Sequence, residues 1–183
     1  MHLLAITPGM GFDPVAWAPV LASGVDALLI REPQLREAEL RAAAEWCRAR
    51  APGVGIWVRG VAVAGCGLHV PEGGTGTGRP LSRPLHDEAQ WEARRGADQL
   101  LLSPIFETPG KGPAWGPGRL RTFLEGLPPE GPRLLALGGI TPANAAQLHH
   151  PRLAGIAAIR PFWTGDAAAA VAAFRGAWET SPR

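Results

Sequence analysis

The stretch LLALGGITPANAAQL, residues 134–148, decides the fold together with GIAAIR, residues 155–160. A continuous apolar run opens the first segment, as expected for a strand that is covered on both faces. Gly138 and Gly139 then turn the chain, and Thr141 followed by Pro142 is typical of the start of a helix. A buried strand, a helix and a second buried strand in this order predict a parallel sheet.

Gly138 and Gly139 are also candidate ligand-binding residues. Two glycines let the backbone approach a ligand closely, and the unpaired N–H groups of a following helix favour negative charge. A turn that needs positive φ angles explains the same pair equally well. The position after the seventh of eight strands favours a phosphate site, because the loops after strands 7 and 8 of a (β/α)8 barrel commonly bind phosphate.

The same alternation of strand and helix extends over the whole chain. Strands are expected at residues 2–7, 26–32, 55–58, 68–70, 81–85, 99–106, 134–138 and 155–160. Helices are expected after Asp13, at 35–50, at 87–95, around 120–127, at 141–149 and after Asp166. Only about ten residues separate the fourth and fifth strands, too few for a crossover helix. We therefore predict a single domain, residues 1–183, folded as a shortened α/β (β/α)8 TIM barrel with the helices between strands 3 and 5 reduced or missing.

Composition excludes several classes of protein. The formal net charge is +2 and no basic stripe is visible, so no nucleic-acid partner is expected. No apolar run approaches the roughly 20 residues of a membrane span. Cys47 and Cys66 lack a metal-binding or redox spacing and are expected to be buried thiols in a cytoplasmic protein.

Lys111 is the single lysine of the chain, which marks it as a special position.

A series of motifs resembles the thiamine phosphate synthase/TenI family over essentially the whole chain. The motifs are LLAIT (3–7), ALLIRE (27–32), GLHVPEGG (67–74), RPLHDEAQW (83–91), GADQLLLSPIFETPGKGP (96–113), LLALGGITPANAAQL (134–148) and GIAAIR (155–160). The resemblance implies a (β/α)8 barrel. It also implies that a thiazole phosphate binds at the C-terminal face, with its phosphate at Gly138, Gly139, Ile159 and Arg160.

Synthases of this family join a pyrimidine pyrophosphate to the thiazole phosphate with Mg²⁺, and this sequence departs from their pattern. The family has Gln-x-Arg-x-Lys after strand 2, where this chain has Leu29, Arg31 and Pro33. After strand 3 an Asp that binds magnesium is replaced by Arg59, and a second Asp by Ala62. Since Mg²⁺ needs carboxylate oxygens, the magnesium pyrophosphate half of the synthase reaction is predicted to be disabled.

TenI members aromatise the thiazole phosphate by a proton shift. Those that act as tautomerases carry a His before the F-E-T segment, where this chain has Pro104, although Glu107 and Thr108 fit that segment. We expect Glu107 to be the general base, partly buried so that its pKa is raised. Lys111 in the same loop is the expected catalytic cation, with a solvated loop charge as the alternative.

The remaining candidates each have a functional and a structural interpretation. Arg31 and Arg59 are expected to bind an anion, although an ion pair with Glu32 or a neighbouring carboxylate would equally explain Arg31. His86 is a candidate catalytic residue, but a structural bond to a neighbouring loop fits it better, and the same holds for His69. His149 and His150 are interpreted as structural. Trp115 is expected to pack on the surface or on a partner, with a lid over a flat ring as the alternative.

These observations predict a metal-independent thiazole tautomerase that needs no cofactor. The first alternative is a thiamine phosphate synthase with an altered pyrophosphate site, which would need Mg²⁺. The second is a non-catalytic protein that binds thiazole phosphate or thiamine phosphate and has a regulatory role. Because the missing helices would expose residues 61–70 as an apolar patch, we also expect a homodimer that covers this flank.

Overall fold

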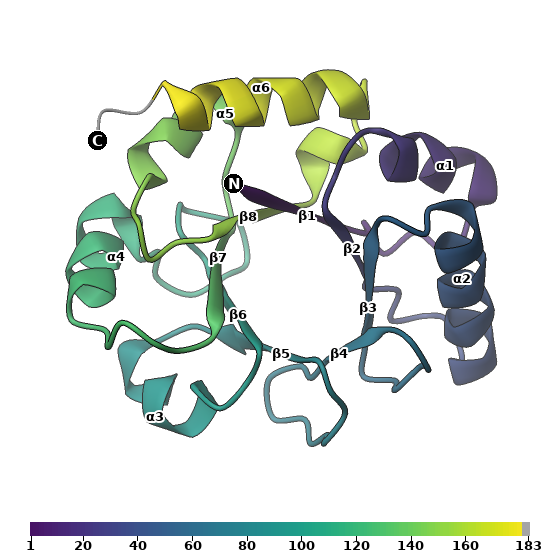
Figure 1. Cartoon of the computed structure of the whole chain (residues 1–183), viewed down its shortest axis with the longest axis horizontal. Coiled ribbons are helices and arrows are strands. Elements are labelled where there is room, and N and C mark those ends of the chain that lie inside the picture. Colours follow the sequence, from purple (N-terminus) through teal and green to yellow (C-terminus); the bar gives the residue numbers. More distant parts are fainter. Residues whose placement is uncertain (181–183) are drawn as a thin grey trace.

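Eight short apolar segments form the strands of the barrel. In the computed structural model, which describes residues 1–180, they are β1 (His2–Ile6), β2 (Ala27–Ile30), β3 (Gly55–Arg59), β4 (Gly67–His69), β5 (Leu81–Leu85), β6 (Gln99–Leu102), β7 (Arg133–Leu137) and β8 (Gly155–Ala158). Each strand pairs in parallel with its neighbour in sequence, and β8 pairs with β1, so the sheet closes (Figure 1). The predicted (β/α)8 barrel is confirmed. The last three residues of the predicted domain lie outside the described part.

Helices surround the barrel except on one side. They are α1 (Pro14–Ala22), α2 (Glu37–Arg50), α3 (Trp91–Arg94), α4 (Gly116–Glu125), α5 (Pro142–Ala145) and α6 (Ala167–Glu179). Short 3-10 turns at Glu88–Gln90, Ala146–Leu148 and Arg160–Phe162 complete the regular structure. Only loops follow β3 and β4, as predicted, and Figure 1 shows this flank without a helix. No described helix has the length and apolar character to cross a membrane.

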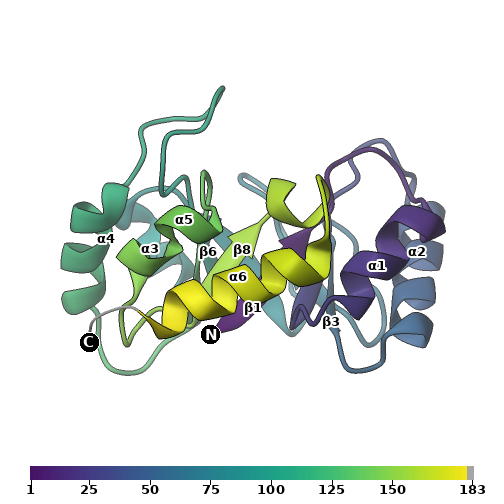
Figure 2. The same cartoon turned by 90° about the horizontal axis from the view of Figure 1, so that it is seen from above.

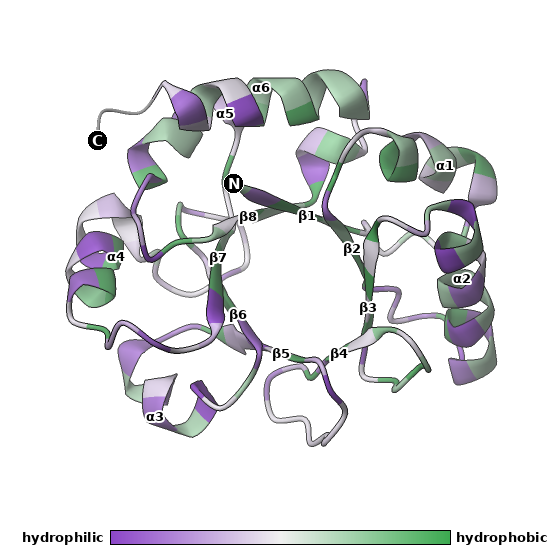
Figure 3. Ribbon diagram, viewed as in Figure 1, coloured by the Kyte–Doolittle hydropathy of each residue, from purple (hydrophilic) through white to green (hydrophobic). Residues whose placement is uncertain are grey.

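The strands are apolar on both faces because both faces are covered. Their outward side chains pack under the helices. Figure 3 shows that the strands are largely hydrophobic, whereas hydrophobic and hydrophilic residues alternate along α2. The inward side chains form a second cluster of Leu4, Ile6, Ala27, Leu29, Trp57, Leu101, Leu135 and Ala157. Trp57 fits inside because its neighbour Gly67 has no side chain: a Cβ there would lie 2.2 Å from the indole Cε3. The interior is therefore packed beneath its C-terminal end.

The flank without helices is not the apolar patch that we expected. Val63, Cys66 and Val70 are only 7%, 8% and 1% exposed. The glycine-rich loop after β4 covers part of this flank, because a Cβ on Gly76 would lie 2.8 Å from Val70 Cγ2 and 2.9 Å from Leu68 Cδ2. The prediction of an exposed flank is wrong, since a flat loop replaces the missing helix. The flank therefore no longer supports the expected homodimer, which remains a prediction.

Several elements are shorter than the sequence pattern indicated, and two of these differences, in β6 and α5, bear on the site. β6 ends at Leu102 instead of Phe106, although the amides of Ile105 and Phe106 still donate to the carbonyl oxygens of Leu137 and Gly138. The helix expected at 141–149 is the four-residue α5 followed by a 3-10 turn. Its capping amide, that of Thr141, already donates to Asn144 Oδ1 at 2.8 Å. A helix dipole therefore contributes less to an anion site here than the sequence implied.

Candidate functional site

A cavity of about 550 Å³ opens where the strands end at their C-terminal side. Its walls are apolar near the ends of β1, β2, β6 and β7, from the side chains of Ile6, Leu29, Leu101 and Leu137. The long loop between β6 and α4, which stands above the barrel in Figure 2, adds Thr108 and Lys111 to the rim. The cavity thus combines a flat apolar interior with a polar rim, as in most sites for small molecules.

Three cationic side chains line this cavity: Arg31 from the end of β2, Arg59 from the end of β3, and Lys111 from the loop. No carboxylate is among its lining residues in the described part of the chain. Among residues 1–180, the ion pair expected as the alternative for Arg31 is not found. Glu32 is buried and accepts from the amides of Gly9 at 3.0 Å and Gly11 at 2.6 Å, so it anchors the β1–α1 loop. The positive charges of the cavity remain available to an anion.

This set of donors does not fit a magnesium ion. A hard divalent cation needs carboxylate or carbonyl oxygens, whereas guanidinium groups of Arg31 and Arg59 repel it. No cluster of three His, Cys, Asp or Glu side chains able to hold a metal occurs within residues 1–180. We therefore assign no step at this site to a metal ion.

A second hollow of about 450 Å³ adjoins the cavity at the ends of β7 and β8. Gly138, Gly139, Ile159 and Arg160, the residues predicted to bind phosphate, line this hollow together, and Gly138 and Ile159 also line the central cavity. Both glycines have positive φ angles, +100° and +65°. A Cβ on Gly139 would lie 2.7 Å from Phe106 Cβ, so the turn also needs glycine for packing. The structure brings these residues together. The positive φ angles and the close packing of the two glycines are compatible both with a turn that needs glycine and with a ligand-binding site.

Glu107 is not placed as we expected. It is exposed and lines a separate outer hollow beside Thr108 and Lys111, and it is not among the residues of the central cavity. The predicted partial burial of this carboxylate is wrong, because the loop after β6 turns outward once Phe106 has packed against Gly139. Lys111 lines both the central cavity and this outer hollow.

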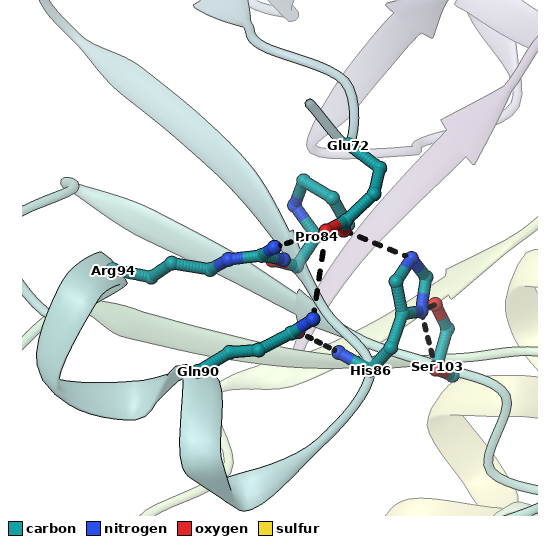
Figure 4. A network of polar contacts seen from close by, with 6 residues as sticks. All are labelled: Glu72, Pro84, His86, Gln90, Arg94 and Ser103. Atoms are coloured by element: carbon teal, nitrogen blue, oxygen red, sulfur yellow. Dashed lines mark hydrogen bonds and ion pairs between the residues drawn. The ribbon is translucent and has the colours of Figure 1, made fainter. Parts of the chain in front are cut away.

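His86 lines the cavity but is held by its neighbours. Its Nδ1 lies 2.7 Å from the carbonyl oxygen of Ser103, and its Nε2 lies 3.7 Å from Glu72 Oε2 (Figure 4). Glu72 in turn accepts from Arg94 Nη2 at 2.5 Å, which lowers the pKa of the Glu72 carboxyl. The contacts agree with the structural interpretation of His86, which joins the loop after β4 to the end of β6.

His69 is the buried titratable group of the cavity. Its ring is 7% exposed, and Nδ1 lies 3.0 Å from Ser82 Oγ, which also accepts from Gln99 Nε2 at 3.4 Å. Burial lowers the pKa of His69 to about 4, and the nearby charges of Arg59 and Arg31 act in the same direction. Sequence reasoning interpreted this residue as structural. The signal that it missed is a polar residue at the inward position of four consecutive strands.

The other singled-out residues are structural in this fold. Trp115 is 3% exposed and packs against Phe123 with ring centroids 5.1 Å apart, so the expectation of surface packing or a lid is wrong. His149 packs against Trp178, and His150 Nδ1 accepts from the amide of Arg152. Cys47 and Cys66 are free buried thiols, as predicted, and burial raises the pKa of Cys47 to about 12.

Comparison with known proteins agrees with these features at the level of family and fold. Residues 81–162 match the family model described as thiamine monophosphate synthase. The sequence matches none of the curated proteins. The predicted resemblance to the thiamine phosphate synthase/TenI family is thus confirmed over the second half of the barrel, and its leaning toward TenI stays a prediction.

Solved structures with the same fold include two thiamine phosphate pyrophosphorylases. The protein from Pyrococcus furiosus has 19% sequence identity and a TM-score of 0.82, covering 100% of this chain and 97% of its own. The protein from Bacteroides thetaiotaomicron has 14% identity and a TM-score of 0.69, covering 100% of both chains. A 3-keto-L-gulonate-6-phosphate decarboxylase from Vibrio cholerae has 15% identity and a TM-score of 0.68, covering 100% and 99%. At these identities the likeness shows the fold alone.

Proposed function

We propose that this chain, which carries the match to the thiamine monophosphate synthase family over residues 81–162, is a thiazole phosphate-binding tautomerase that works without a metal ion. The observation that supports this function best is a cavity that is lined, within residues 1–180, by three cations and no carboxylate, and that is continuous with the glycine turn after β7. A dianionic phosphate on a flat heterocycle matches both parts of such a site.

The proposed binding mode assigns each end of the ligand to one part of the site. The phosphate lies at Gly138, Gly139 and Arg160, and the ring lies over Leu101 and Leu137 in the apolar part of the cavity. Arg31, Arg59 and Lys111 then face the ring and any charge that it carries. The aromatising proton shift needs one group that removes a proton and returns it, and it needs no Lewis acid.

The synthase is the second candidate, and one observation favours it. The central cavity carries Arg31 and Arg59 on the side away from the glycine turn, so a second anion has a place beside the thiazole phosphate. If that anion is pyrophosphate, the two guanidinium groups take over the charge neutralisation that a metal gives in a synthase. A binding protein without turnover is the third candidate.

Calorimetric titration with thiazole phosphate, with and without Mg²⁺ and pyrophosphate, separates these candidates when it is combined with a turnover assay. We expect tight binding that is indifferent to the metal, and metal-free conversion of the non-aromatic tautomer followed by proton NMR. Magnesium-dependent joining of the two thiamine precursors would instead favour the synthase. Binding without any turnover would favour the regulatory protein. No binding of thiazole phosphate under any of these conditions would exclude both enzymes and leave only a protein that binds thiamine phosphate.

Replacing Arg31 tests the charge of the cavity. Arg31→Gln should weaken thiazole phosphate binding by about 10-fold to 100-fold, the usual effect of one charge-assisted hydrogen bond. Arg41→Gln is the matched control, because Arg41 is exposed on α2 and pairs with Glu37. Equal affinities of the two variants by calorimetry would remove Arg31 from the site.

A further inference from the structure

A row of polar side chains crosses the inside of the barrel on one side. Arg59 in β3 is the register partner of His69 in β4, His69 that of Ser82 in β5, and Ser82 that of Gln99 in β6. The interior positions of β1, β2 and β7 are instead leucine, isoleucine and alanine. Polar groups are costly to bury, so four in adjacent strands need a reason.

His69 is the member of this row that presents a titratable ring atom to the cavity. Arg59 and His69 line the cavity, whereas Ser82 and Gln99 lie behind them and are 1% and 2% exposed. Nδ1 of His69 is engaged by Ser82 Oγ at 3.0 Å. No partner within residues 1–180 is found for Nε2, which is therefore the ring nitrogen left for a ligand.

The other titratable groups of the cavity fit proton transfer less well. Arg31 and Arg59 stay protonated at any physiological pH. His86 has Nδ1 on the carbonyl oxygen of Ser103 and Nε2 beside Glu72. Glu107 does not line the cavity, and Lys111 is an exposed ammonium on the rim. His69 is thus the group that a proton shift requires: it is neutral and buried, with Nδ1 hydrogen-bonded and Nε2 left for the ligand.

We infer that His69 is the proton-transfer residue of the site and that Ser82 and Gln99 position its ring. The inference rests on the proposed tautomerase function. In the step, Nε2 of His69 takes the proton from a ring carbon of the non-aromatic thiazole phosphate, and the electron pair of the broken C–H bond moves into the ring. The same N–H bond then breaks to protonate the second carbon, which ends the double-bond shift. No oxidant, reductant or metal is consumed.

Gln99 supplies a second, independent observation. Its Oε1 is buried and has no hydrogen-bond partner, while its Nε2 faces Ser82 Oγ. A half-turn of the amide brings Oε1 to the Ser82 hydroxyl, which then donates to it and accepts from Nδ1–H of His69. In that state the Ser82 hydroxyl both donates and accepts a hydrogen bond, and Nε2 of His69 keeps its lone pair toward the cavity. Ser82 and Gln99 thereby select the basic tautomer.

The charges around His69 link proton transfer to ligand binding. Arg59 from β3 and Arg31 from β2 are its charged neighbours, and Ser82 and Gln99 are neutral. Burial and the two guanidinium groups hold the imidazole neutral while the cavity is empty of anions. An anionic ligand beside Arg31 and Arg59 offsets their charge and raises the pKa of His69, so the ring becomes a better base when substrate is bound.

Two variants and one control test the inference through turnover. His69→Gln should bind thiazole phosphate within about 3-fold of the unchanged protein, yet lose at least about 100-fold in kcat for the metal-free tautomerisation, as expected for a missing acid–base group. Ser82→Ala should lower kcat about 10-fold at unchanged KM and shift the pH profile, because the ring keeps its place but loses its tautomer control. His150→Gln, outside the cavity, should be normal. Turnover by folded His69→Gln at the original rate would overturn the inference.

A proton NMR titration of His69 separates this inference from the proposed function and tests it without turnover. The pH at which the His69 ring signals change half-way should rise when inorganic phosphate is added, and Ser82→Ala should titrate differently. If the protein does not bind thiazole phosphate but this rise is seen, the substrate assignment fails and the anion-linked base stands. If the titration is unchanged by phosphate, the role of His69 is excluded even where thiazole phosphate binds.

Discussion

The imidazole of His69 is buried beside two guanidinium groups, and a proton on it is costly in the folded state. Its pKa is about 4 in the fold and close to the usual 6.5 in an unfolded chain. Between these two values the unfolded chain binds more protons than the folded one. Stability due to this residue is therefore complete above pH 6.5 and is lost as the pH falls toward 4.

Urea unfolding at pH 7 and at pH 5 measures this linkage. The free energy of unfolding should fall by about 2 kcal/mol from His69 alone between these pH values. His69→Gln should lack that part of the loss, while the contributions of His2 and His150, whose pKa values burial also lowers, remain in both proteins. An equal loss in both proteins would show that His69 is not held neutral by the fold.

Three of the site residues named from the sequence lie together in the structure, and a fourth does not. Arg31, Arg59 and Lys111 were expected at the site, and all three line one cavity because each lies at or beyond the C-terminal end of a strand. Glu107 was expected there too, but the loop that carries it turns outward over Gly139. The position of a residue in a long loop depends on packing partners that are distant in sequence.

At the level of elements, the loop of residues 71–80 takes the place of a helix. Gly76 packs on Val70 and Leu68, and Gly78 packs on Leu68. Glu72 binds Arg94 of α3 and lies beside His86. The short spacing in the sequence predicted the missing helix correctly. The spacing did not predict that the loop covers the flank. That coverage depends on the ion pair between Glu72 and Arg94 and on glycines, which have no side chain to hold the loop away from the barrel.

Glu72→Gln should loosen this loop without unfolding the barrel. Because the pair with Arg94 is half-exposed, we expect little change in Tm, but about 5-fold to 10-fold faster amide hydrogen exchange in residues 71–78. Glu92→Gln, which removes an exposed pair with Arg95, is the control and should leave the loop unchanged. Unaltered exchange in the Glu72 variant would mean that the glycine packing alone holds the loop.

At the level of the whole molecule, the barrel depends on the closure between β8 and β1. His2 is the register partner of Gly155, and a Cβ on Gly155 would lie 1.9 Å from the carbonyl oxygen of His2. Backbone atoms of a paired strand cannot move aside as a flexible side chain can. The first and last strands of the chain therefore meet only because residue 155 is glycine.

Gly155→Ala should lower the free energy of unfolding by about 3 kcal/mol or more, the upper range of an overpacked core. Gly176→Ala is the matched control: this glycine lies inside α6 with no atom near its added Cβ, so the same change should stabilise the protein by about 0.5 to 1 kcal/mol. Denaturant unfolding of both variants decides the matter. A Gly155 variant as stable as the unchanged protein would show that closure tolerates a shifted register.

The sequence by itself determined the eight strands, their parallel order and the missing helices, because apolar runs, glycine turns and short spacings are local signals. It also determined that the C-terminal face carries cations where a magnesium site would need carboxylates. Only the tertiary structure decided that His69, Ser82 and Gln99 meet inside the barrel and that Glu107 stays outside. The contacts of Ser82 with His69 and with Gln99 join residues 13 and 17 positions apart through strand register, which no local pattern contains.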